Sequence, residues 1–383
     1  MDKVRMGVIG VGGMGSHHAR YLQAGEVKRA EITAVCDIDE DKLKNWSGLE
    51  TFDDSAQLIR SGLVDAVIVA TPHYDHTTIG IDAMQQGLHL LTEKPISVHK
   101  ADCERLIAAH TANPKLVFAA MFQQRTDPVW KKMKKLIDSG ELGEITRITW
   151  IITDWFRTEA YYASGGWRAT WSGEGGGILL NQCPHNLDMW QWLFGMPSKI
   201  RAFMQFGAKH NIEVEDQVHA YLEYENGATG AFIVSTGEAP GTNRLEVAGE
   251  RGKLVVERGK ILFTRNEIPM TEFSRTTDRS FAVPPVWHIE IPSEGGPAGH
   301  KVVTQNFVDA ILDGVPLIAP AEEGIKSVEL ANTMVYSQLK DLTVQLPLDS
   351  AAYEATLKEL IANSKFVKKT AKERQEDIAT SFH

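Results

Sequence analysis

The sequence predicts an α/β protein with an N-terminal doubly wound parallel sheet and a C-terminal α+β part that contains a large, open-faced, mostly antiparallel sheet. Three observations support this prediction. The chain has 383 residues, more than one hydrophobic core usually serves. Short apolar runs alternate with helical patterns as far as Gln123, and beyond it the runs alternate in polarity instead. We therefore expect one domain at 1–122 and a second at 123–383.

The first domain is expected to alternate buried strands with crossover helices. The strands are predicted at Val4–Ile9, Ile32–Cys36, Ala66–Ala70, His89–Thr92 and Val117–Met121. The helices are predicted at His17–Ala24, Glu40–Asn45, Ser55–Arg60, Thr77–Gln86 and Lys100–His110. This rhythm is typical of a parallel sheet with helices on its faces.

The second domain opens with a predicted helix, Pro128–Ser139, and continues as a sheet. Its strands are expected at Ile145–Asp154, Ile200–Phe206, Gln217–Tyr224, Thr229–Ser235, Leu245–Ala248, Lys253–Glu257 and Ile261–Phe263. Asn226-Gly227 is a strong hairpin-turn signal between two of them. Helices at Val302–Asp313 and Glu322–Lys340 are expected to close the domain, and a charged tail helix is expected from about Ser350. Because such a sheet has one face free, we expect a homodimer or homotetramer through that face.

The formal net charge of −10 at pH 7 argues against nucleic acid or an anionic membrane as a partner. The basic run Lys365–Arg374 is local and is interpreted as a solvated helix face. Cys36, Cys103 and Cys183 are odd in number and share no CxxC spacing, which fits a reducing cytoplasm. No apolar run is long enough for a signal-peptide core or a membrane span, so we expect a soluble cytoplasmic protein.

A glycine-rich loop, Gly10-Val11-Gly12-Gly13-Met14-Gly15, lies between the first predicted strand and the first helix. In this context G-x-G-x-x-G predicts a dinucleotide site. Gly10 permits the tight turn, Gly12 lets the backbone approach the pyrophosphate, and Gly15 allows close helix–strand packing. The helix N-terminus offers NH groups to the phosphates.

Asp37 closes the second predicted strand, where the acidic partner of such a loop is expected. Its carboxylate can accept both ribose hydroxyl protons and repels a 2′-phosphate. The sequence therefore favours NAD over NADP.

The sequence resembles the glucose-fructose oxidoreductase and inositol dehydrogenase (Gfo/Idh/MocA) family over nearly the whole chain. The ordered motifs that carry the resemblance are the glycine loop with His18, Thr71-Pro72 with His76, Gly87-Leu88-His89 before Glu93-Lys94-Pro95, Gly175-Gly176-Gly177 before His185 and Asp188, Asn306-Phe307 to Leu312 with Pro316, and Glu322-Glu323-Gly324. The resemblance implies a Rossmann domain, a sheet domain used for substrate binding and oligomerisation, and oxidation or reduction of one secondary alcohol of a sugar or cyclitol. It implies Lys94 and His185 at the reacting hydroxyl, and Thr71, Pro72 and Glu93 beside the nicotinamide half of the cofactor. His76, in the same loop as Thr71, is a further candidate for cofactor binding.

Elementary chemistry agrees with these roles. Lys94 follows the C-terminal end of a strand, where doubly wound sheets bind ligands. A histidine can take the hydroxyl proton, and an ammonium can stabilise negative charge on that oxygen. Asn181, His185 and Asp188 have the spacing of one helix face, although Pro184 indicates that the helix begins near it and leaves Asn181 at the cap. The family commonly has aspartate at the position of Asn181, so proton transfer or substrate class is expected to differ here.

The segment from Tyr161 to Gly177, rich in aromatic residues and glycine, is interpreted as a loop that covers a ligand. Candidates for contact with a sugar are Gln123, Arg125, Asp154, Trp155, Tyr161, Tyr162, Trp167, Arg168, Trp171 and Asp216, with packing or surface ion pairs as the alternative. His73 and His76 have an H-x-x-H spacing, but we expect His76 to orient its loop and expect no metal.

Two other functions stay open at this point. Relatives of the family include NAD-dependent glycosidases that oxidise a ring hydroxyl only transiently, and a noncatalytic dinucleotide-binding sensor. The presence of both Lys94 and His185 argues against the sensor.

Overall fold

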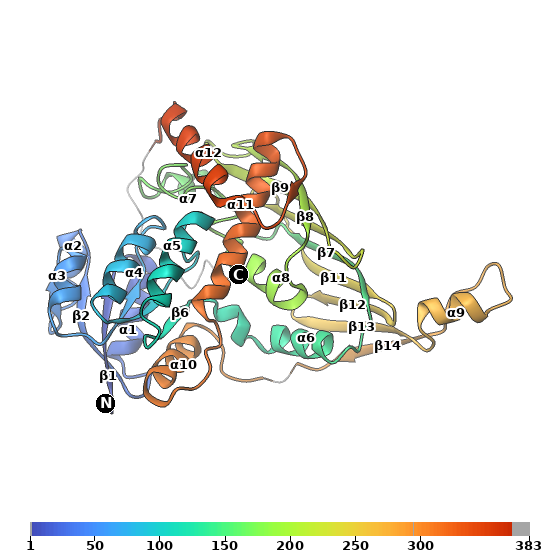
Figure 1. The fold of residues 1–383 in the computed structure, drawn as a ribbon, viewed down its shortest axis with the longest axis horizontal. Helices are drawn as coiled ribbons and strands as arrows, with labels where there is room; N and C mark the ends of the chain where they lie inside the picture. The colour runs from blue at the N-terminus through green and yellow to red at the C-terminus, as the bar shows by residue number, and fades with distance from the viewer. Residues whose placement is uncertain (1, 294, 370–383) are drawn as a thin grey trace.

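The computed structural model describes residues 2–293 and 295–369, which form two sheets and the helices packed on them (Figure 1). The first sheet is parallel, with strand order β3-β2-β1-β4-β5-β6. Its strands are β1 Val4–Ile9, β2 Ala30–Cys36, β3 Glu50–Phe52, β4 Ala66–Val69, β5 His89–Thr92 and β6 Phe118–Ala120. Its helices are α1 Gly13–Gln23, α2 Glu40–Leu43, α3 Ser55–Arg60, α4 Asp75–Gln85 and α5 Lys100–Thr111. The predicted doubly wound domain is confirmed.

The sequence prediction misses β3, a short strand with only Phe52 partly buried. Its pattern is too short and too polar to indicate a strand by itself. It forms because β2 offers it an edge, through pairs such as Cys36 with Phe52.

The second sheet has strand order β14-β13-β12-β11-β7-β10-β9-β8-β15. Its strands are β7 Ile145–Ile152, β8 Lys199–Phe206, β9 Glu215–Glu223, β10 Thr229–Ser235, β11 Asn243–Gly249, β12 Gly252–Glu257, β13 Lys260–Asn266, β14 Val286–Ile291 and β15 Val344–Gln345. The predicted hairpin between β9 and β10 is confirmed, with Gly227 at φ +85°. The sheet is mostly antiparallel as predicted, but β7 and β10 pair in parallel. The long connection between them allows the chain to return in the same direction, which a tight turn does not.

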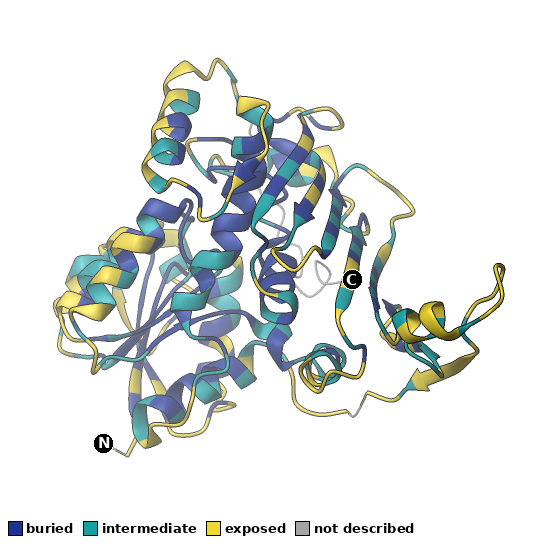
Figure 2. Cartoon of the chain, turned by 45° about the vertical axis from the view of Figure 1, so that its right-hand side comes forward, coloured by how far each residue is buried: buried dark blue, intermediate teal, exposed yellow. Residues whose placement is uncertain are grey.

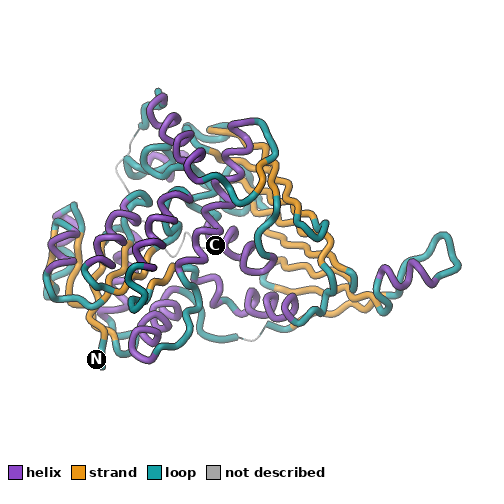
Figure 3. Tube along the Cα trace, viewed as in Figure 1, coloured by secondary structure: helices purple, strands orange, loops and turns teal. Residues whose placement is uncertain are grey.

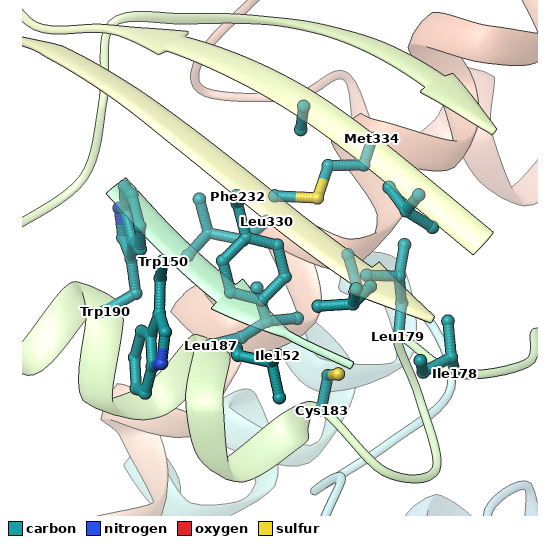
Figure 4. Close-up of a cluster of buried hydrophobic side chains, with 14 of the residues drawn as sticks. Trp150, Ile152, Ile178, Leu179, Cys183, Leu187, Trp190, Phe232, Leu330 and Met334 are labelled. Atoms are coloured by element: carbon teal, nitrogen blue, oxygen red, sulfur yellow. The ribbon is translucent and has the colours of Figure 1, made fainter. Parts of the chain in front are cut away.

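Helices cover one face of this sheet, and within residues 2–293 and 295–369 no helix covers the other face (Figure 3). They include α6 Pro128–Asp138, α8 Pro184–Phe194, α11 Gly324–Lys340 and α12 Ser350–Asn363. Trp150 and Phe232, from neighbouring strands, pack against Trp190 of α8 and Leu330 of α11 (Figure 4). Burial of these large apolar side chains fixes α8, and with it His185, relative to the sheet.

Helix α10, His300–Asp313, packs on the first sheet. Val303, Phe307 and Val308 share a core cluster with β1 residues such as Val4 and Met6. The helix is expected from the sequence to close the second domain, and it packs on the first sheet instead. The helix periodicity indicates an apolar face but not which sheet the face covers.

An extended arm between β13 and β14 carries α9, Met270–Thr276 (Figure 2). The exposed surface of Phe281 is 101% of its reference value and that of Val283 is 82%. No residue of α9 is buried. The sequence analysis predicts neither α9 nor β14, because neither has a stripe of core-facing residues.

The tail helix is confirmed as α12, which ends at Asn363. The basic run Lys365–Arg374 is not helical over residues 365–369, and its remaining residues lie outside the described part of the chain. Among the described residues, no helix has the length and apolarity needed to cross a membrane.

Candidate active site

The glycine loop joins β1 to α1 and has the shape a pyrophosphate requires. Gly10 has φ +87°, and a Cβ there would lie 2.7 Å from the Ala70 carbonyl oxygen. A Cβ on Gly15 would lie 1.7 Å from the Gly10 oxygen, so the helix start packs directly on the turn. A Cβ on Gly12 meets nothing within 4 Å, which leaves that side of the backbone open to a ligand. Gly13 begins α1 and Met14 follows it, so their amides lie in the first turn, where phosphate binds.

Asp37, at the end of β2, is buried and braces this loop. Its two carboxylate oxygens accept hydrogen bonds from the amides of Val11, at 2.9 Å, and Asp39, at 3.0 Å. Lys42 Nζ lies 3.5 Å from Asp37 Oδ1. The acid predicted to bind the ribose therefore lies against the phosphate loop, so the residues present fit an adenine dinucleotide.

Glu93 and His18 form a buried pair between β5 and α1. His18 Nε2 lies 2.7 Å from Glu93 Oε1, and its Nδ1 lies 2.6 Å from the hydroxyl of Tyr21. That hydroxyl is 2.7 Å from Thr304 Oγ1 of α10. Burial disfavours the charged form of Glu93, but the hydrogen bond from His18 and the nearby cations outweigh burial and lower the pKa of Glu93. Glu93 is therefore a fixed negative charge beside the next residue, Lys94.

Lys94 lies at the C-terminal end of β5, as the sequence predicts. Its Nζ donates a hydrogen bond of 2.9 Å to the backbone oxygen of Asn181. Burial lowers the pKa of Lys94, while the charges of Glu93 and Glu174 oppose that shift. Burial therefore favours the neutral amine more than water would, and the two carboxylates favour the ammonium.

His185 is in the first turn of α8 and is buried. Burial and then the charge of Lys94 lower its pKa well below the ordinary 6.5. Its Nε2 lies 3.2 Å from Gln123 Nε2, and Nδ1 has no hydrogen-bond partner among the described residues. The structure therefore brings a neutral imidazole near an amine, as the predicted proton transfer requires.

Asn181 does not share a helix face with His185. Helix α8 begins at Pro184, with Cys183 as its N-cap, so Asn181 belongs to the preceding loop. The i, i+4, i+7 interpretation is wrong for Asn181, for the reason that Pro184 already indicated. Asn181 approaches Lys94 through its backbone oxygen, while its side chain contacts Glu174 and Tyr161.

Asp188, one helical turn after His185, makes a buried ion pair with Arg125. Arg125 Nη2 and Nε lie 2.6 and 2.8 Å from its two carboxylate oxygens, and Arg125 Nη1 lies 2.6 Å from Glu323 Oε2. This guanidinium is fully engaged in joining 3₁₀ helix η1, Gln123–Thr126, to α8. It stabilises the position of His185 and does not present a free cation.

The loop at 164–183, after α7 Glu159–Ala163, holds Trp167, Arg168 and Asn181 from the predicted substrate contacts. Arg168 Nη1 donates to the Tyr161 hydroxyl at 2.7 Å, and Gln182 Nε2 donates to the same oxygen at 2.9 Å. Trp167 packs edge-on against His73, with ring centroids 5.7 Å apart. The Trp155 ring lies 5.1 Å from the Arg157 guanidinium carbon, and its Nε1 has no partner among the described residues.

Four of the predicted substrate contacts are exposed or have partners that stabilise the fold. Asp154 is exposed, and Asp216 accepts bonds from the backbone amides of Ala208, Lys209 and His210. Trp171 packs on Phe206, and the Tyr162 hydroxyl donates to Thr236. The packing alternative matches the structure for Trp171 and Tyr162, whereas Asp216 is buried and holds a turn instead of forming the surface ion pair expected as its alternative.

His76 links the loops after β4 and β5, as expected from the sequence. Its ring nitrogens lie 2.8 Å from the Pro95 oxygen and 2.9 Å from the Thr71 oxygen. The side-chain oxygen of Thr71, beside Pro72 in the same loop, has no hydrogen-bond partner among the described residues. The described residues contain no group of His, Cys, Asp and Glu arranged to hold a metal.

Sequence reasoning missed Glu174, a buried carboxylate seven positions before Asn181. It missed Gln182 and His300 as well. Glu174 and Gln182 lie in an irregular loop, where no helix or strand periodicity indicates which side chains point inward.

These features together define a two-domain dinucleotide-binding protein with an amine and an imidazole at the carboxyl end of its parallel sheet. A family model described as "Oxidoreductase family, NAD-binding Rossmann fold" matches residues 4–121, and one for the GFO/IDH/MocA C-terminal domain matches residues 130–255. The chain belongs to the GFO/IDH/MocA family, and its first domain is an NAD-binding Rossmann domain.

Relatives and solved structures agree with this assignment. Inositol 2-dehydrogenase 1 of Saccharopolyspora erythraea is 35% identical over 147 residues, which cover 37% of this chain and 43% of that relative. Inositol 2-dehydrogenase of Rubrobacter xylanophilus is 27% identical over 344 residues, 88% of this chain and 91% of the relative. The WlbA dehydrogenase of Bordetella pertussis, solved with NADH and UDP-GlcNAcA, superimposes with a TM-score of 0.76 at 25% identity, covering 91% of this chain and 100% of that one.

Proposed function

We propose that this protein is an NAD-dependent dehydrogenase that interconverts a secondary alcohol and a ketone of a sugar, a sugar derivative or a cyclitol. The observation that carries the proposal is the convergence of the half-buried Lys94 and the buried His185 beside the carboxyl end of β5 in a domain that binds NAD. The names of the relatives, inositol 2-dehydrogenases among them, support an alcohol substrate of this class.

The bound nicotinamide supplies the acceptor or donor of a hydride. His185, neutral because burial lowers its pKa, is placed to accept the proton of the reacting hydroxyl. Lys94 is placed to stabilise negative charge on that oxygen, with one N–H already directed to the Asn181 oxygen. Glu93, held ionised by His18, keeps a compensating negative charge next to Lys94.

A polyol substrate also fits the unsatisfied polar atoms near this centre. Buried atoms without a hydrogen-bond partner among the described residues include His185 Nδ1, Gln123 Oε1, Gln182 Oε1 and Trp155 Nε1. Burying such atoms without partners costs free energy, so hydroxyl groups that pair with them would stabilise the complex.

We also propose that the protein prefers NAD to NADP, functions in the cytoplasm and forms a homo-oligomer. Asp37 supports the first, because its carboxylate repels a 2′-phosphate. The three buried, free cysteines support the second. The free face of the second sheet, which exposes Phe203 and Tyr221, supports assembly with another copy of the chain.

A direct test follows NADH absorbance across a panel of inositols, aldoses, glycosides and sugar acids. A dehydrogenase accumulates NADH in proportion to product, whereas a redox-assisted glycosidase releases the aglycone with no net NADH. The proposal would be contradicted if no member of the panel produced NADH and none released an aglycone.

Lys94→Met should lower kcat by about a hundredfold or more, because the charge that stabilises the alkoxide is lost. NADH binding, measured by fluorescence titration, should stay near wild type. Lys28→Met, an exposed lysine, is the matched control and should leave both quantities unchanged. Full activity of the Lys94 variant would remove this residue from the mechanism.

A further inference from the structure

Glu174 is a buried acid in the 164–183 loop to which the proposed reaction assigns no role. Its side chain is 1% exposed. One carboxylate oxygen accepts a hydrogen bond from the Ala169 amide and the other accepts one from Asn181 Nδ2. The nearest guanidinium nitrogen, Arg168 Nη1, lies 3.9 Å away. Burying a carboxylate costs several kcal/mol, so a buried acid held this closely calls for an explanation.

The backbone on both sides of Glu174 is held in place by close packing. A Cβ on Gly173 would lie 2.0 Å from the Trp167 oxygen. Gly175 has φ +75°, and a Cβ there would lie 2.0 Å from Val98 Cγ1 of the first domain. The Glu174 carboxylate therefore has little freedom to move relative to the NAD-binding domain.

Asn181 connects this carboxylate to the reacting centre. Its Nδ2 donates to Glu174, its Oδ1 accepts from the Tyr161 hydroxyl at 3.1 Å, and its backbone oxygen accepts from Lys94 Nζ at 2.9 Å. A rotation of the Asn181 side chain would break the contacts with Glu174 and Tyr161, while the contact with Lys94 belongs to the backbone of the same residue. The hydrogen bond to Glu174 fixes the orientation of the Asn181 side-chain amide, because an ionised carboxylate can accept only from its NH₂ group.

We propose that Glu174 is a positioning residue: through its bond to Asn181 it orders the residue whose backbone oxygen holds Lys94, and its negative charge offsets the Lys94 ammonium. The proposal deepens the proposed function and rests on it, because it assigns the electrostatic support of the Lys94 role.

Charged and titratable groups from every neighbouring element face Lys94. They are Glu93 beside it, Arg168, Glu174 and Cys183 from the 164–183 loop, His73 after β4, His185 in α8 and His300 in α10. Burial lowers the pKa of Lys94, and Glu93 and then Glu174 are the largest influences that raise it. Burial raises the pKa of Glu174, while Arg168 and the hydrogen bonds from Ala169 and Asn181 oppose that shift. Where Glu174 is ionised, replacing it with a neutral group removes the second of these influences on Lys94, so the pKa of Lys94 should fall further.

Glu174→Gln tests this with the full-length protein, since the amide keeps an acceptor for the Ala169 amide but carries no charge. Competitive labelling with acetic anhydride across pH, read by mass spectrometry, reports the apparent pKa of Lys94, with the exposed Lys28 as internal reference. That pKa should fall by about one pH unit in the variant. The alkaline limb of the kcat/KM profile should move to lower pH by a similar amount.

The double variant Glu174→Gln/Asn181→Asp moves the carboxylate across a single hydrogen bond and should return the Lys94 pKa toward wild type. A merely structural role for Glu174 predicts lower thermal stability with no change in the Lys94 pKa, which would overturn the proposal. If the single variant does not fold, the double variant decides, because a Lys94 pKa far below wild type in it contradicts charge compensation. Labelling needs no turnover, so a failure of the dehydrogenase assignment appears separately in the substrate panel.

Discussion

At the scale of single residues, the chemistry of this protein depends on side chains whose pKa values burial has shifted. Burial lowers the pKa values of both Lys94 and His185, so each favours its neutral form more than it would in water. The chain counters this for Lys94 with the adjacent Glu93, held ionised by His18. The sequence motif contains Glu93 and Lys94 together, but the partner of Glu93 is visible only in the folded chain.

The acid limb of the pH–activity profile should reflect the protonation of His185. Because its pKa is lowered well below 6.5, the imidazole stays neutral and able to accept a proton until the pH falls through that lowered value. We expect kcat/KM for alcohol oxidation to be flat near neutral pH and to fall only at a pH below 6.5. Steady-state rates between pH 4.5 and 8 check this, and a limb centred at or above 6.5 would contradict it.

Asp37→Ala should weaken NAD binding by about tenfold or more and should reduce discrimination against NADP. The variant loses the acceptor for the ribose and the brace on the Val11 amide, and it removes the charge that repels a 2′-phosphate. Fluorescence titration with NADH and NADPH measures both effects. Asp41→Ala, at an exposed acid in the same segment, should change neither; an unchanged preference in Asp37→Ala would refute the assigned role.

At the scale of elements, the turn before α8 is held by Glu215 of β9. Glu215 Oε1 accepts hydrogen bonds from the amides of Gly177, at 2.9 Å, and Leu179, at 3.1 Å. A Cβ on Gly177 would lie 2.1 Å from the Glu215 backbone oxygen, so the turn and the strand are in direct contact. The glycine run in the sequence indicates such an approach, but not the strand that it approaches.

Burial raises the pKa of Glu215 from 4.5 to about 7. Because the folded value lies above the unfolded one, the stability it contributes is present below about pH 4.5 and is lost as the pH rises towards 7. Glu215→Gln should therefore unfold with less pH dependence over this window, and should be more stable than wild type at pH 7.5 by roughly 1–3 kcal/mol. Urea denaturation at several pH values measures this, with the exposed Glu225→Gln as control. Parallel pH curves for wild type and Glu215→Gln would contradict the prediction.

At the scale of the whole molecule, the free face of the second sheet and the arm that carries α9 leave apolar side chains in solvent. Phe203 is 60% exposed and Tyr221 47%, on neighbouring strands β8 and β9. Light scattering should give the wild-type protein a mass that is a multiple of 42.5 kDa. Phe203→Glu/Tyr221→Glu should lower that mass, because charges would be buried at the interface. Val315→Glu, at an exposed position on the first domain, should not; a monomeric wild type would remove the oligomer proposal.

The sequence by itself determined the features that depend on neighbouring positions. The glycine loop, Asp37 at a strand end, the Glu93-Lys94 motif and the alternation of strands and helices all express local backbone requirements, so they could be read before the fold was known. The same holds for the hairpin at Asn226-Gly227 and for the start of α8 at Pro184.

Only the tertiary structure decided which distant segments meet. It packed α10 on the first sheet, paired β7 with β10 in parallel, joined Arg125 to Asp188, and brought Lys94 against the Asn181 backbone oxygen. These outcomes depend on shape and charge complementarity between segments far apart in the chain, because burial and close packing select among partners that local patterns leave equivalent.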